Sequence, residues 1–131
     1  MMICPLAVYA EEQAASKPEA EEAVKPESFP PKDSPAAAII RGETAFKRYC
    51  ILCHGVNADG KGRAAKNYDP KPANLRASDK NTIYKTMIVT KGGAAMGRSA
   101  FMPQWSEELT KEQITDVVTY LNSIAEHPPK D

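Results

Sequence analysis

Apolar residues recur at helical spacing in three stretches of the chain, and no stretch alternates apolar and polar residues as a strand would. The clearest pattern lies near the C-terminus, where one apolar stripe follows one side of a helix: Ile114, Val117, Val118, Leu121 and Ile124. Thr110 and Gln113 precede this stripe as a capping box, which marks a helix N-terminus. Pro128 and Pro129 prevent the helix from continuing. The pattern predicts an all-α fold whose last helix begins after Thr110.

A second helical pattern leads from Pro35 into Cys50. Gly42, Phe46 and Cys50 are four residues apart, so they share one helical face. A proline suits the first turn of a helix, whereas a glycine at position 42 lowers helix propensity. We interpret Gly42 as the point where another helix crosses close to the backbone, and the C-terminal helix is the predicted partner.

The third pattern predicts a middle helix that begins at Ser78 or Asp79 and stops at Gly92 and Gly93. Its predicted buried residues are Ile83, Tyr84, Met87 and Ile88. A glycine- and lysine-rich loop precedes this helix and a long loop follows it. The fold class predicted is therefore all-α, with three main helices joined by loops.

The N-terminal third of the chain has a different composition. Residues 1–10 are apolar and uncharged and resemble the tail of a secretory signal peptide cleaved after Ala10. They lack the basic start of such a signal, so either the true start lies upstream or the segment is not a working signal. Residues 11–36 form an acidic linker rich in Pro, Ala and Glu, which we expect to be disordered. The folded domain is predicted to span residues 37–131.

The formal net charge of zero conceals two oppositely charged parts. Residues 1–40 carry three lysines and seven acidic residues, whereas residues 41–131 carry 14 basic and 10 acidic side chains. Ten of the basic residues lie between Arg48 and Arg98, opposed by three aspartates. These charges are either scattered over a solvated surface or form a docking patch for an acidic partner. In the second case the acidic linker could fold over the patch and compete with that partner.

The sequence Cys50-Ile51-Leu52-Cys53-His54 is the attachment site of a c-type haem. Each cysteine sulfur adds to one vinyl group of the porphyrin, and the adjacent histidine can coordinate the iron. A redox dithiol of this spacing normally follows a β-strand, and the sequence before Cys50 shows no strand pattern. A structural zinc site needs four ligands, and the remaining candidates, Cys4 and His127, lie at opposite ends of the chain. We predict one haem c, attached through Cys50 and Cys53 and ligated by His54.

Residues 40–126 resemble a class I cytochrome c, a single-haem electron carrier. The matching residues are Gly42 and Phe46 before the Cys50–Gly55 motif, then Pro72-Ala73-Asn74-Leu75, Met102-Pro103 and Tyr120-Leu121. The resemblance implies a small cytochrome c fold in which helices and loops surround one covalently bound haem. It implies that the first and last helices cross where Gly42 and Phe46 meet Val117, Tyr120 and Leu121.

The iron needs a sixth ligand or a vacant site. The candidates are Met87, Met96 and Met102. Met87 lies on the apolar face of a predicted helix, where methionine usually fills a core. Met102 precedes Pro103, as the ligand methionine of the resembled family does, and is the predicted ligand, with Met96 left as an alternative. His127 is expected to be a solvated residue after the last helix.

The resemblance also implies neighbours of the haem. The carbonyl of Pro72 is predicted to accept a hydrogen bond from the second ring nitrogen of His54, with Pro70 left open because this loop has one extra residue. The two propionates need hydrogen-bond donors, for which the candidates are Trp105, Arg98, Arg76 and Asn74. The residues expected to pack on the macrocycle are Leu75, Ile83, Met87 and Phe101.

The resulting prediction is an exported, periplasmic electron-transfer protein, and not an enzyme. Its iron would cycle between ferric and ferrous states and pass electrons between redox protein partners with an acidic docking face. We expect no nucleic-acid partner and no small-molecule substrate. A membrane tether stays open, although no stretch has the roughly 20 apolar residues of a transmembrane helix. The alternatives are a haem c subunit of a larger oxidoreductase, and a haem enzyme or gas sensor with an open sixth site.

Overall fold

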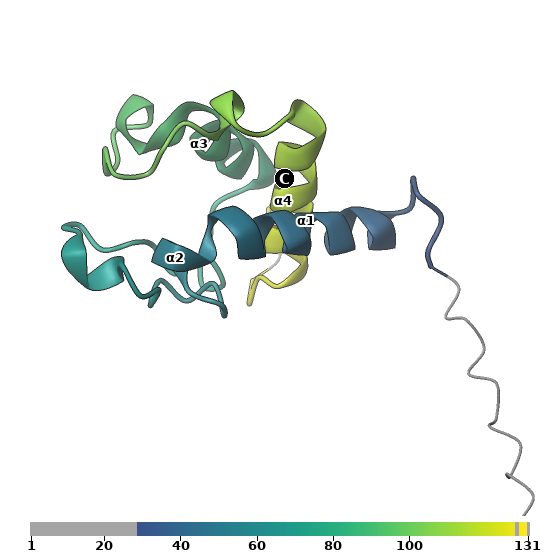
Figure 1. The fold of residues 1–131 in the computed structure, drawn as a ribbon, viewed down its shortest axis with the longest axis horizontal. Helices are drawn as coiled ribbons and strands as arrows, with labels where there is room; N and C mark the ends of the chain where they lie inside the picture. Colours follow the sequence, from purple (N-terminus) through teal and green to yellow (C-terminus); the bar gives the residue numbers. More distant parts are fainter. Residues whose placement is uncertain (1–28, 128, 131) are drawn as a thin grey trace, which may run out of the picture.

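The computed structural model describes residues 29–127 and 129–130. The predicted signal-peptide segment and most of the predicted linker lie outside these residues. The described part is helical and contains no strand, which confirms the all-α fold class (Figure 1). Its elements in chain order are α1 (Pro35–Tyr49), α2 (Ile51–His54), η1 (Ala65–Asn67), α3 (Thr82–Ala95), η2 (Trp105–Glu107) and α4 (Lys111–Ser123). None of the described helices is long and apolar enough to span a membrane.

Helices α1 and α4 cross at Gly42, as predicted (Figure 1). A Cβ atom on Gly42 would collide with the backbone carbonyl of Asp116 and with Cβ of Tyr120, so only glycine allows this approach. Next to the crossing, Phe46 is completely buried, and its ring lies 5.5 Å from that of Tyr120. Val117 of α4 is buried in the same core. The residues predicted to form the crossing therefore do form it.

An ion pair that the hydrophobic pattern did not reveal also joins α1 to α4. The guanidinium of Arg41 donates to both carboxylate oxygens of Asp116, over 2.7 and 3.0 Å. Asp116 is buried, and the Arg41 side chain is partly exposed. A third donor on Arg41, Nη1, donates to the backbone carbonyl of Lys32 over 2.7 Å. The pair thus connects the helix crossing to the segment that precedes α1.

Helix α4 begins as the sequence predicts. Thr110 accepts a hydrogen bond from the backbone N–H of Gln113 over 3.2 Å, and the Gln113 side chain accepts one from the Thr110 backbone over 2.9 Å. Leu109, just before the cap, is buried together with Ile114 and with Val89 of α3. One side of α4 therefore packs on α1, and its first turn packs on α3.

Helix α3 departs from the prediction at its start and in its orientation. It begins at Thr82, where Asn81 caps it through a 2.9 Å bond from the backbone N–H of Tyr84. Gly92, with φ 78°, interrupts the regular helix where the glycine pair predicted an end. The expectation that Ile83 and Met87 are buried is wrong, because 68% of Ile83 and 37% of Met87 is exposed.

The rotation of α3 follows from polar contacts. Lys85 and Val89, one turn apart, are the buried residues of this helix apart from its two glycines. The side-chain oxygen of Asn122 on α4 accepts a hydrogen bond from the Lys85 ammonium over 2.8 Å. The amide nitrogen of Asn122 donates to the hydroxyl of Thr82 over 2.9 Å. These bonds turn the face carrying Thr82, Lys85 and Val89 toward α4, which leaves Ile83 and Met87 on the opposite side.

Candidate haem site

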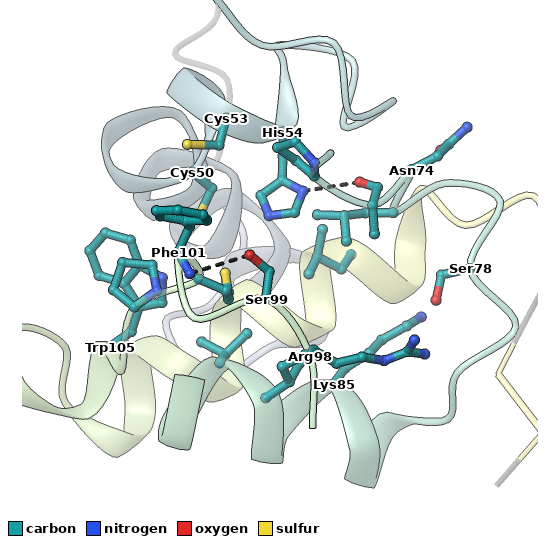
Figure 2. Close-up of a pocket in the computed structure, with 18 of the residues that line it drawn as sticks. Cys50, Cys53, His54, Asn74, Ser78, Lys85, Arg98, Ser99, Phe101 and Trp105 are labelled. Carbon is teal, nitrogen blue, oxygen red and sulfur yellow. Dashed lines mark hydrogen bonds between the residues drawn. The ribbon is translucent and has the colours of Figure 1, made fainter. Parts of the chain in front are cut away.

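A cavity of about 870 Å³ lies between the helix pair α1–α2 on one side and α3 with its following loop on the other (Figure 2). Its walls are mostly apolar, and α4 closes the inner end with Val117 and Leu121. Its size falls within the usual range of about 300–1,000 Å³ for ligand and cofactor pockets. The cavity can therefore hold a large, mainly apolar group.

The two cysteines and His54 lie together at one end of the cavity (Figure 2). Cys50 ends α1 and begins the short helix α2, and the backbone N–H of His54 donates to the carbonyl of Cys50 over 2.9 Å. This single helical turn directs both sulfurs to the same cavity, as the spacing of the motif predicts. The two cysteines do not form a disulfide with each other.

Burial, reinforced by the neighbouring Cys53, raises the pKa of the Cys50 thiol to about 12. Cys50 is therefore a neutral thiol at pH 7 in this fold, unlike the depressed-pKa thiolates of redox dithiols. Among the described residues, no group of three or more His, Cys, Asp and Glu side chains is arranged so that it could hold a metal ion. A thioether bond would remove the ionisable proton of Cys50 altogether.

The ring of His54 is held by the backbone. Its Nδ1 lies 3.1 Å from the carbonyl oxygen of Ala73, to which it donates in the neutral tautomer (Figure 2). Burial lowers the pKa of His54, and the Ala73 carbonyl partly offsets that effect. A neutral ring whose Nδ1–H is engaged has the Nε2 lone pair available for a metal.

The predicted acceptor for His54 was therefore wrong, because it is Ala73 and neither Pro72 nor Pro70. The reason is the extra residue in this loop: Ala73-Asn74-Leu75 occupies the place of a Pro-Asn-Leu element, and a carbonyl acceptor needs no proline. Pro72 and Leu75 nevertheless line the cavity. Leu75 also packs on the core that contains Phe46.

Of the three methionines considered as ligands, Met102 alone lines the cavity. Its backbone is fixed by a 2.9 Å hydrogen bond from the N–H of Gly93 to the Met102 carbonyl. A Cβ on Gly93 would collide with the carbonyl of Ser99, so glycine is required for this loop to fold back on α3. Met96 caps the end of α3, and Met87 lies on its exposed face. His127 is exposed, as expected.

Two aromatic pairs flank the cavity. Trp105 packs edge-on against Tyr49 at 5.6 Å between ring centroids, and Phe101 meets Tyr68 at 5.0 Å. Both pairs join residues from opposite sides of the cavity, and all four residues line it. Phe101 is 59% exposed, so this pair lies at the cavity mouth. Trp105 and Phe101 lie toward the Cys50 side (Figure 2).

The predicted propionate donors do not form one group. Arg98 lies far from Trp105 in the cavity (Figure 2), and its Nε donates to the hydroxyl of Tyr84 over 3.1 Å. Asn74 lines the cavity, but its side-chain oxygen caps a turn by accepting from the backbone N–H groups of Arg76 and Ala77. The side chain of Arg76 does not line the cavity. The four candidates therefore cannot act together.

The charges in the cavity wall have one sign. Among the described residues that line it, four are cationic and none is an aspartate or glutamate. The cationic residues are Lys71, Lys80, Lys85 and Arg98. The sequence reading missed Lys85, because lysine is almost never fully buried; its only signal was the four-residue spacing to Val89. A cationic wall suits a ligand that carries carboxylates.

These features fit a covalently attached haem. Two thiols lie at one end, the available nitrogen of His54 and the thioether of Met102 belong to the same cavity, and cations line the wall. Bound there, a haem would supply one-electron chemistry at its iron. The chain's own residues would attach it, orient it and exclude water.

The sequence comparison shows the family of the chain. The family model described as cytochrome c matches residues 39–125, and the chain belongs to the cytochrome c family. It is 28% identical over 97 residues to the Cbb3-type cytochrome c oxidase subunit CcoP of Azospirillum brasilense, covering 71% of this chain and 30% of that protein. It is 29% identical over 98 residues to CcoP of Azospirillum sp. (strain B510), covering 71% and 31%. The chain thus spans about a third of the length of these relatives.

A solved structure gives the same picture of the fold. The Kuenenia stuttgartiensis reducing HAO-like protein complex Kustc0457/Kustc0458 contains a chain that matches with a TM-score of 0.57 and 26% sequence identity. The match covers 70% of this chain and 46% of the other. Both comparisons support a cytochrome c domain that carries haem and serves in electron transfer.

Proposed function

We propose that the protein is a one-electron carrier with a single haem c, bound through Cys50 and Cys53 and ligated by His54 and Met102. The observation that carries this proposal is that one cavity is lined by both thiols, the oriented imidazole and Met102, but not by Met87 or Met96. With His54 and Met102 both bound to the iron, no site for a substrate would remain there. The protein then sets the reduction potential through its ligands, hydrogen bonds and burial.

The test is the sixth ligand. The ferric wild-type protein should show the weak far-red absorption band of methionine-ligated, low-spin haem c and should bind cyanide slowly. Met102→Ala should lose the band, bind cyanide readily and have a lower reduction potential, because thioether sulfur favours ferrous iron. Met96→Ala is the matched control and should behave as the wild type. The reverse result would assign the ligand to Met96.

The same measurement separates the electron carrier from an open-site haem enzyme or gas sensor. Rapid cyanide or carbon monoxide binding by the unmodified protein, at the rate of Met102→Ala, would favour the open site. The fixed loop around Met102 supports the closed site, because the bond from Gly93 holds the residue against α3.

We further propose that the partners are redox proteins, and that the chain works beside or within a larger oxidoreductase. The support is that relatives similar to this chain are named as a subunit of a Cbb3-type cytochrome c oxidase and as part of a reducing HAO-like protein complex. Purification of the native protein under mild conditions should yield a complex with another redox protein. Recovery of the protein alone, with rapid reduction by a soluble donor, would favour a free shuttle.

The basic surface offers a docking position for an acidic partner. A groove of about 490 Å³ beside α2 is lined by four cationic residues: Lys47, Arg48, Lys61 and Arg63. The exposed apolar side chains of Leu52 and Val56 lie in the same groove. Leu52 lines both this groove and the haem cavity, so a partner in the groove would approach Cys53 closely.

We expect such docking to steer the encounter and to weaken with salt. Replacing Arg48 and Lys61 by glutamine should slow electron transfer to an acidic partner at low ionic strength and flatten its salt dependence. The control replaces Lys111 and Lys130, which are exposed elsewhere, so that net charge changes equally. Equal effects of the two variants would remove the docking groove and leave only a net-charge effect.

We also propose that the protein is exported, since attachment of haem to a CxxCH motif normally takes place outside the cytoplasm and residues 1–10 resemble the end of a signal peptide. Intact mass measurement of the native protein should show loss of these residues. Retention of Met1 in cytoplasmic holo-protein would contradict export.

A further inference from the structure

Lys85 is a buried cation in the wall of the haem cavity. Only 6% of the residue is exposed, and it lines the cavity one turn before Val89 on α3. Burying a charged group is costly unless hydrogen bonds and opposite charge compensate it. The groups around its ammonium therefore determine what this charge can do in the cavity.

Helix α4 fixes the position of the Lys85 ammonium. Its Nζ donates to the side-chain oxygen of Asn122 over 2.8 Å. The amide nitrogen of Asn122 donates in turn to the hydroxyl of Thr82 over 2.9 Å, one turn before Lys85 on α3. A buried network with satisfied polar groups rigidifies its members, so the charge is held at one place in the cavity.

The surroundings of Lys85 favour an anion. Arg98, whose Nε donates to the Tyr84 hydroxyl over 3.1 Å, and Lys80, whose ammonium pairs with Asp79 over 2.9 Å, line the same cavity. No aspartate or glutamate among the described residues lines this cavity. Figure 2 shows Lys85, Arg98 and Ser78 at the side of the cavity away from Cys50 and Cys53. A haem attached by its vinyl edge at Cys50 and Cys53 directs its carboxylate edge away from them.

We propose that Lys85 binds a haem carboxylate and raises the reduction potential of the iron, and that Asn122 positions it for this role. The proposal rests on the proposed function, because it requires a haem in the cavity. Its physical basis is charge: a fixed cation in a poorly screened cavity disfavours ferric iron more than ferrous iron. Removal of the cation leaves the carboxylate uncompensated, which stabilises the ferric state further.

The experiment measures the reduction potential of purified holo-protein. Lys85→Met keeps the length of the side chain and removes its charge. It should shift the ferric–ferrous equilibrium about tenfold toward the ferric state, which corresponds to a fall of about 59 mV for one electron. Lys85→Arg should restore most of the wild-type potential. The matched control is Lys111→Met on α4, where an exposed charge is lost to solvent, and its potential should not change.

A second readout separates binding of the carboxylate from a general structural effect. The carboxylate bands in the redox-induced infrared difference spectrum should shift in Lys85→Met and return toward their wild-type positions in Lys85→Arg. Asn122→Ala should also lower the reduction potential, by a smaller amount than Lys85→Met. If the Lys85→Met protein does not accumulate, the potential of Asn122→Ala tests the proposal in its place.

An unchanged potential in both Lys85→Met and Asn122→Ala, or carboxylate bands that do not move, would overturn the proposal. Failure of this proposal and failure of the proposed function are distinguishable. Haem staining on a denaturing gel and the spectrum of the methionine-ligated ferric protein report the function itself. Lys85→Met with both signals intact and an unshifted potential would remove the role of Lys85 and leave the electron carrier in place.

Discussion

The two sides of the haem cavity are joined to α4 by different kinds of contact. On the side that carries Cys50 and His54, α1 crosses α4 through Gly42 with the backbones in direct contact. On the side that carries Met102, α3 meets α4 through the hydrogen bonds of Asn122 and a smaller apolar cluster that contains Val89. The first junction depends on the shape of close-packed groups and the second on the placement of a few polar atoms.

The difference has consequences for how each side responds to change. Close-packed cores tolerate additional volume poorly, because their neighbours have no space to move. A junction with fewer buried apolar contacts opens locally at lower free energy. We therefore expect the cysteine and histidine side to be rigid and the methionine side to be the more mobile one.

The largest effect should follow from loss of both thiols. Cys50→Ala with Cys53→Ala removes both thioether bonds, so the cavity of about 870 Å³ loses its covalent anchor. Holo-protein yield should fall sharply, because a domain this small depends on such a staple. Haem staining on a denaturing gel measures the result. An undiminished stain would contradict covalent attachment at this motif.

Next in size is the helix crossing. Gly42→Val places side-chain atoms into the backbone carbonyl of Asp116, which cannot move away without displacing α4. The free energy of unfolding should fall by about 3 kcal/mol or more, at or above the upper end of the usual cost of overpacking. Denaturant unfolding of the holo-protein followed by circular dichroism measures it. Ala36→Val, at an exposed position of α1, should cost only about 0.5 kcal/mol.

A smaller loss should follow from cutting the polar junction of α3. Asn122→Ala removes the bonds to Lys85 and Thr82. The free energy of unfolding should fall by about 1–2 kcal/mol, and amide exchange should accelerate in α3 more than in α1. Gln104→Ala, which removes an exposed bond of 3.5 Å to Glu107, serves as the control. Equal acceleration in both helices would mean that the two junctions are not independent.

The smallest effect concerns the exposed face of α3. Met87→Gln should change the free energy of unfolding by no more than about 0.5 kcal/mol, because the side chain does not enter the core. Val89→Ala, half a turn away and buried, should cost about 2 kcal/mol. Similar losses from the two substitutions would show that α3 is rotated relative to the structure described here.

The same contrast explains what sequence reasoning could predict. Gly42, Phe46 and the cysteine–histidine motif have steric or chemical requirements that few other residues meet. Their pattern alone therefore predicted the helix crossing at Gly42 and brought Phe46 and the motif to one cavity. Their roles toward iron stay predictions. The capping box of Thr110 was equally direct, because it depends on residues three apart.

The α3 side could not be predicted in this way. Its sequence is apolar on more than one face, and periodicity favoured Ile83 with Met87, whereas Lys85 and Val89 are the buried pair. The choice depends on Asn122, a residue of another helix far along the chain. The predicted acceptor for His54 was wrong by one residue for a similar reason. Any residue can supply a backbone carbonyl, so the side-chain sequence does not identify which one accepts the bond.

The hydrogen bond between Arg41 and the carbonyl of Lys32 affects how the domain would be oriented if it were tethered through its N-terminal side. It fixes the direction in which the preceding chain leaves α1, at the end opposite to Cys50 (Figure 1). Because α1 has 15 residues, its two ends are about 22 Å apart. A protein tethered through its N-terminal segment would thus be attached at the end of α1 that lies farthest from Cys50. The cavity that carries Cys50 and His54 would then face away from the point of attachment.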